Sequence, residues 1–201
     1  MKKVDMKMME KYIIDRHQAE MAQRGENKGG YAVLIGMIDP AKFVDIYYTS
    51  TRKLRNMVEG LYHKKVKKGG GRKVSLTSSK DRVETAASVQ HGILAALDEY
   101  MAEELLKAWL FTKRTMLVTA LDFFGVEHED GLTDKDLSAF EKADVATLEK
   151  LVAELKAKEC LVEDIAIYFQ FMHIENAMNV AELKKVFADW GTLVEDEKAA
   201  E

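Results

Sequence analysis

The sequence is poor in the residues that cross-link chains or interrupt helices. Its 201 residues include one cysteine, Cys160, and one proline, Pro40. A single cysteine excludes a disulfide within the chain and is typical of a reducing compartment, where a buried cysteine serves as a small hydrophobic residue. Because proline interrupts a helix interior, its scarcity leaves long stretches free to form helices. We therefore expect a cytoplasmic protein with a high helix content.

Long hydrophobic runs are also missing. The longest is "YAVLIGMI" at residues 31–38, whereas a helix that crosses a bilayer needs roughly 20 apolar residues. We expect no transmembrane helix and no membrane partner.

The sequence lacks the short motifs of common enzyme and metal sites. It contains no phosphate-binding G-x-x-x-x-G-K-[ST] loop, no G-x-S-x-G nucleophile motif and no Glu-x-x-His pair of the kind that holds a di-iron centre in a helical bundle. The histidines are scattered along the chain: His17, His63, His91, His128 and His173. We expect no catalytic residues, no metal site and no cofactor. The sequence favours a non-enzymatic protein, with an active site built from distant residues as the open alternative.

Helix-favouring residues and helical spacing of apolar residues are abundant. Asp39 before Pro40 is typical of a helix start and predicts a helix over residues 40–63. Apolar residues recur every three to four positions from Val83 to Trp109, which predicts a long central helix. We expect an all-α, multi-helix bundle. Further helices are predicted over residues 4–23 and, after a break near Thr112, over residues 115–124. The region from Thr133 is predicted to form compact helices, one of which is capped by Asp144. A last helix begins with a capping box of Asn179 and Glu182 and ends at Gly191.

The secondary structure of three segments is less clear from the sequence. Residues 31–38 and 164–174 are apolar on nearly every side, so their periodicity fits a buried helix or a strand, and we favour helix in both. Residues 64–77 form either a small basic β-hairpin or a flexible loop. Residues 125–131, "GVEHEDG", form a short acidic loop.

The predicted domain organisation has three parts. Residues 1–131 form the main helical domain and include the basic loop. Residues 132–191 form a C-terminal helical subdomain, which is either separate or continuous with the first, and residues 192–201 form an acidic tail with a frayed end.

Positive and negative charges are concentrated in opposite halves of the chain. Residues 1–86 carry 19 Lys and Arg against 10 Asp and Glu, a net charge of +9, whereas residues 87–201 carry 11 and 24, a net charge of −13. Such asymmetry indicates a polyanionic partner or a complementary protein surface. Packing of the two halves on each other is the alternative without a partner.

The strongest local signal is "KKVKKGGGRK", residues 64–73, with six cations around three glycines. Lysine and arginine side chains there can neutralise phosphates, and glycine N–H groups can add hydrogen bonds to phosphate oxygens. The candidate nucleic-acid contacts are Lys64, Lys65, Lys67, Lys68, Arg72 and Lys73, supported by Arg52, Arg55, Lys80 and Arg82. Tyrosines of the preceding helix are candidates for stacking on bases.

The sequence thus predicts a helical protein that binds DNA or RNA through phosphates without reading bases, as an accessory subunit of a nucleoprotein complex. In this interpretation the acidic C-terminal half faces solvent or a basic protein partner. The alternatives are a protein–protein interaction or assembly module that uses the oppositely charged halves, and a solvated basic loop with no partner.

Overall fold

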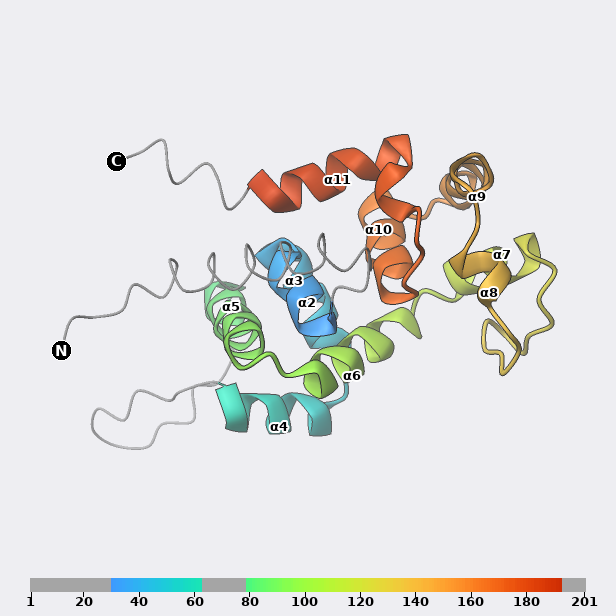
Figure 1. The fold of residues 1–201 in the computed structure, drawn as a ribbon. Coiled ribbons are helices and arrows are strands. Elements are labelled where there is room, and N and C mark those ends of the chain that lie inside the picture. The colour runs from blue at the N-terminus through green and yellow to red at the C-terminus, as the bar shows by residue number, and fades with distance from the viewer. Residues whose placement is uncertain (1–29, 63–78, 193–201) are drawn as a thin grey trace, which may run out of the picture. The chain divides into compact units, whose positions relative to one another are not determined.

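The computed structural model describes residues 30–62 and 79–192, and most of these residues are helical (Figure 1). Within those two ranges there are ten α-helices, one 3₁₀-helix and no strand beyond a single β-bridge. The elements are α2 (Tyr31–Met37), α3 (Pro40–Thr49), α4 (Arg52–Tyr62), α5 (Ser79–Ala96), α6 (Glu99–Leu110), α7 (Arg114–Phe123), α8 (Ser138–Glu141), α9 (Val145–Ala157), α10 (Val162–Phe171), η1 (Ala177–Asn179) and α11 (Ala181–Thr192). The predicted all-α multi-helix fold is confirmed. The predicted helix over residues 4–23, the segment 64–77 and the tail from residue 193 lie outside the described residues.

The described residues divide into two compact units. The first comprises residues 30–109, without the segment 63–78, and the second comprises residues 110–192. Each unit has its own buried residues. The subdomain boundary that the sequence predicts after residue 131 stays a prediction.

Helix α5 is the centre of the first unit. It packs against α2, α3 and α4, and it buries Ala86, Val89 and Ile93 completely. The buried Gln90 side chain donates Nε2–H bonds to the carbonyls of Ile35 (2.7 Å) and Ile38 (2.6 Å) at the end of α2. These bonds satisfy carbonyls that have no partner within their own helix. With 18 residues, α5 is the longest of the described helices, and residues 31–37 are helical, as favoured for the segment 31–38.

The predicted helix over residues 40–63 is wrong in one respect, because it is two helices, α3 and α4. The start is as expected, since Asp39 Oδ1 accepts a hydrogen bond from the Ala41 N–H (2.7 Å) and Pro40 occupies the first helical position. Ser50 then adopts an extended conformation and its Oγ donates to the Tyr47 carbonyl (2.7 Å). Thr51 Oγ1 accepts from the Leu54 N–H (3.2 Å), which starts α4. Local hydrogen bonds from serine and threonine side chains thus compete with the helix.

The apolar pattern from Val83 to Trp109 also covers two helices rather than one. Leu97 has a φ of +49°, and it is 48% exposed although the pattern places it inside. Asp98 Oδ1 then accepts from the Met101 N–H (3.1 Å) and caps α6. A left-handed residue followed by an aspartate cap turns the chain here while the apolar spacing continues.

The second unit is built around an aromatic cluster. The ring of Phe140 lies 4.8 Å from Phe124, 5.8 Å from Tyr168 and 5.7 Å from Phe169, measured between centroids. Residues 164–169 of α10 are all buried, so the prediction of a buried helix over residues 164–174 is confirmed as far as Phe171, where α10 ends.

The helix ends of the second unit agree with the sequence in most cases. Asp144 caps α9 by accepting from the Thr147 N–H (2.7 Å), and Gly125, with a φ of +64°, follows α7. The last helix differs, because Asn179 belongs to η1 and α11 passes Gly191 to end at Thr192. None of the described helices has the length and hydrophobicity needed to span a membrane.

Candidate nucleic-acid interface

The predicted phosphate contacts fall into two groups. Lys64, Lys65, Lys67, Lys68, Arg72, Lys73 and the side chain of Lys80 lie outside what the structure describes. Arg52 and Arg55 lie in the first turn of α4, and Arg82 lies near the start of α5. The helices that carry these three arginines border the basic decamer on either side along the chain.

Arg55 holds the corner between α3 and α4. Its Nη1 donates to the carbonyl of Tyr48 (2.8 Å) and to the carbonyl of Ser50. Both acceptors lie at the C-terminal end of α3, where carbonyls lack helical partners and the helix dipole favours a cation. This guanidinium therefore has a positioning role, which limits what it can offer to an external phosphate.

Tyr48 brings Arg55 and Arg82 together. The guanidinium carbon of Arg82 lies 4.3 Å from the centroid of the Tyr48 ring, and that of Arg55 lies 5.8 Å from it. Burial raises the pKa of the Tyr48 hydroxyl, and the nearby Arg82 charge partly opposes that rise. The ring thus stays neutral and presents its electron-rich face to cations. In this way the structure places the starts of α4 and α5 next to each other.

Three cations at these two helix starts have no ion-pair partner among the described carboxylates. Among the described residues, Arg52, Lys53 and Arg82 are exposed and form no ion pair with a carboxylate. The first turn of α4 holds no acidic residue, so the cations there also face the positive end of the helix dipole. We call Arg52, Lys53 and Arg82 the cationic cluster.

Several cations elsewhere in the described chain are paired with carboxylates. Lys107 Nζ lies 2.8 Å from Glu103 Oε1 on the same helix. In the second unit, Lys113 Nζ lies 2.9 Å from Asp164 Oδ2, and Arg114 pairs with Asp130. The cationic cluster differs from these paired cations, because its three side chains form no ion pair with a described carboxylate.

The tyrosines of α3 and α4 are engaged inside the protein. Tyr47 is fully buried and donates its hydroxyl to Glu59 Oε1 (2.6 Å), and burial together with this carboxylate raises its pKa. Tyr62 donates to Asp98, and burial with this hydrogen bond raises its pKa to about 12. Neither phenol is therefore free to stack on a base.

The described residues do not bring acids, histidines and cysteines together into a group that could hold a metal ion. Cys160 lies near Asp164 and Lys113, and burial raises the pKa of its thiol while the Asp164 carboxylate raises it further. A raised pKa keeps the thiol protonated, which is unlike the environment of a nucleophilic cysteine.

Sequence reasoning missed a tight hairpin in the acidic loop. The N–H of Glu129 donates to the carbonyl of Leu132 (2.8 Å), and the N–H of Leu132 donates back (3.0 Å). The two residues between them, Asp130 and Gly131, have φ values of +56° and +87°, as in a type I′ turn. The Asp-Gly dipeptide is a known signal for this turn, so the sequence contained the information.

No family model, no curated protein and no solved structure matches this chain. Its function is therefore inferred from the chain's own residues.

Proposed function

We propose that this protein is a non-enzymatic, cytoplasmic helical protein that binds nucleic acid through phosphates, independently of base sequence, as an accessory subunit of a nucleoprotein complex. The observation that carries the proposal is the cationic cluster. Three uncompensated cations lie at the starts of α4 and α5, and the chain between these helices contains six more positive residues in ten positions.

Phosphate is the ligand that best suits this chemistry. Exposed arginine and lysine side chains bind phosphate oxygens by charge-assisted hydrogen bonds, and they release condensed counterions from the polyanion. Tyr47 and Tyr62 are engaged within the fold, so among the described residues the proposal rests on charge and not on stacking by these two rings. Binding that depends on charge alone is independent of base sequence.

The test is the salt dependence of binding to labelled single- and double-stranded DNA and RNA. The variant Arg52→Gln/Lys53→Gln/Arg82→Gln removes the cationic cluster and leaves Arg55 in its corner. For every phosphate that the variant no longer neutralises, the slope of log affinity against log salt should fall by about 0.7 to 0.9. We expect the triple variant to bind more weakly at 50 mM salt, roughly in the range where phosphate contacts dominate, and to have a shallower slope.

The matched control is Lys158→Gln/Lys184→Gln/Lys185→Gln. These three lysines are exposed on the second unit, and the change in net charge is the same. The control variant should bind nearly as the original protein does. Equal weakening in both variants would mean that net charge alone governs binding, and unchanged binding of the first variant at low salt would contradict the proposal.

A second proposal is assembly through the oppositely charged parts of the chain. It is favoured by residues 110–192, which carry 9 Lys and Arg against 16 Asp and Glu. Contact between a basic part of one copy and an acidic part of another is heterologous and gives rings or filaments. Light scattering across protein concentration at low and high salt tests it, since a mass that stays monomeric at low salt contradicts charge-driven self-assembly.

A further inference from the structure

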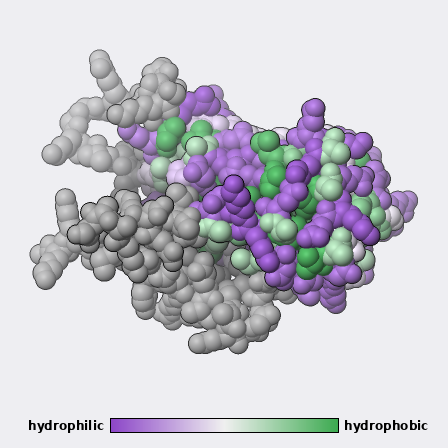
Figure 2. All heavy atoms as spheres, turned by 90° about the horizontal axis from the view of Figure 1, so that it is seen from above, coloured by the Kyte–Doolittle hydropathy of each residue, from purple (hydrophilic) through white to green (hydrophobic). Residues whose placement is uncertain are grey.

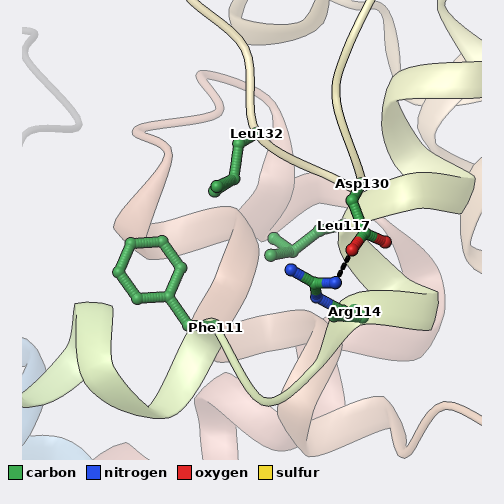
Figure 3. Close-up of a pocket in the computed structure, with 5 residues that line it drawn as sticks. All are labelled: Phe111, Arg114, Leu117, Asp130 and Leu132. Carbon is green, nitrogen blue, oxygen red and sulfur yellow. Dashed lines mark ion pairs between the residues drawn. The ribbon is translucent and has the colours of Figure 1, made fainter.

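The second unit has a small surface hollow beside the hairpin (Figure 3). Its volume is about 110 Å³, somewhat below the ~150 Å³ of an apolar cavity that holds benzene, so it suits one small side chain. Five residues line it: Phe111 after α6, Arg114 and Leu117 of α7, and Asp130 and Leu132 of the hairpin. Gly131 packs against α7, because a Cβ there would lie 2.9 Å from Leu117 Cβ. The hairpin therefore packs directly against α7.

The walls of the hollow are mainly apolar. Phe111 is 55% exposed and Leu132 is 49% exposed, and both side chains extend toward the hollow, with Leu117 beside them (Figure 3). The face of the molecule in Figure 2 mixes small hydrophobic patches with hydrophilic side chains. Two large apolar side chains that share one hollow present more apolar surface at one point than a singly exposed residue does.

The charge at the rim is negative. Arg114 and Asp130 compensate each other. Glu129 lies directly opposite Leu132 in the β-bridge, so the two side chains project from the same face of the hairpin. Glu129 is exposed, and within the described part of the chain it forms no ion pair. About one cross-strand spacing, ~5 Å, separates the Cβ atoms of Glu129 and Leu132. An unpaired carboxylate thus lies on the hairpin next to the apolar wall of the hollow.

We propose that this hollow docks a basic peptide segment of a partner protein. One aliphatic side chain of the segment enters between Phe111 and Leu132, and a lysine or arginine next to it pairs with Glu129. Charge complementarity selects this occupant, because the excess of Asp and Glu over Lys and Arg in residues 110–192 attracts cations and repels phosphate groups. The proposal concerns the second unit and does not rest on the nucleic-acid contacts of the first.

The probe is a synthetic peptide with the sequence of residues 64–76, in which Val66 is flanked by lysines. Its binding to the full chain is followed by fluorescence anisotropy at low salt. Phe111→Ala should weaken binding at least about fivefold, as truncation of a central apolar contact does. Glu129→Gln should weaken it about two- to fivefold, as expected for a charge pair at a rim. A peptide with Val66→Ser has the same charge and should also bind more weakly.

The control variant is Glu149→Gln, which removes one exposed carboxylate from α9 and should leave peptide binding unchanged. Circular dichroism verifies that Phe111→Ala keeps its helix content. Absence of peptide binding, equal weakening by Glu149→Gln and Glu129→Gln, or full binding by Phe111→Ala would each overturn the proposal. Since Phe111→Ala and Glu129→Gln leave the cationic cluster intact, nucleic-acid binding should be unaffected, which separates the two proposals.

Discussion

At the residue scale, Gly92 of α5 and Gly60 of α4 differ in the space that is available for a side chain. A Cβ added at Gly92 of α5 would lie 2.6 Å from the Cβ of Tyr62, which is an atom close to the backbone of α4. A Cβ added at Gly60 of α4 would meet no atom within 4 Å. Substitution by alanine should therefore change the stability of the protein in opposite directions at the two sites.

We predict that Gly92→Ala lowers the free energy of unfolding by about 1–3 kcal/mol, the usual cost of an overpacked site. Gly60→Ala should raise it by about 0.5–1 kcal/mol, because alanine loses less backbone freedom than glycine in a helix. Urea denaturation of both variants is the measurement. A stabilising effect of Gly92→Ala would show that α4 can move away from α5 without loss.

At the scale of elements, an ion pair connects the starts of α7 and α10. Lys113 and Asp164 lie 2.9 Å apart, and their side chains are only 27% and 6% exposed. Lys156 and Glu182 form a comparable contact of 2.5 Å between α9 and α11, but their side chains are 42% and 45% exposed. The two pairs differ mainly in burial and therefore in screening by solvent.

We predict that Asp164→Asn destabilises the protein by about 2 kcal/mol, because Lys113 is then left partly buried with a neutral neighbour. Glu182→Gln should cost less than about 1 kcal/mol, as for other exposed pairs. Double-mutant cycles with Lys113→Met and Lys156→Met measure the two coupling energies. Equal coupling in both cycles would contradict the argument from burial.

The helices were predictable to the extent that their signals are local. Asp39 and Asp144 cap the helices expected of them, because a cap needs only its own next few residues. The break at Ser50 was missed since the apolar spacing continues through it, although Ser50 and Thr51 are residues that compete with helix hydrogen bonds. Leu97 was misplaced for the same reason, because periodicity records spacing and cannot show a turn of the chain.

The candidate site was predictable in composition and not in geometry. The positions of charged residues in the sequence were enough to select Arg52, Arg55 and Arg82 and to show the charge asymmetry. That Arg55 bonds to the Tyr48 and Ser50 carbonyls depends on the corner between α3 and α4, which the sequence pattern did not predict. The hollow forms where the hairpin packs against α7. The spacing of apolar residues in the sequence does not predict this tertiary contact.

At the scale of the whole molecule, the two units have separate cores. Phe140 is 1% exposed within the aromatic cluster of the second unit, and Phe43 is fully buried in the first. Compact units with their own cores commonly unfold as separate cooperative units. A large truncation in one core should therefore reduce protection mainly within its own unit.

We predict that Phe140→Ala, which should cost about 3–5 kcal/mol, increases amide exchange across residues 114–192 while residues 79–109 keep their protection. Phe43→Ala should have the reciprocal effect. Hydrogen–deuterium exchange followed by mass spectrometry of peptic peptides measures both, with the unmodified chain as reference. If protection fell equally in both ranges for either variant, the chain would unfold as one cooperative body. In that case a ligand that stabilises the first unit would also stabilise the second, because binding to the native state shifts every equilibrium that includes its unfolding.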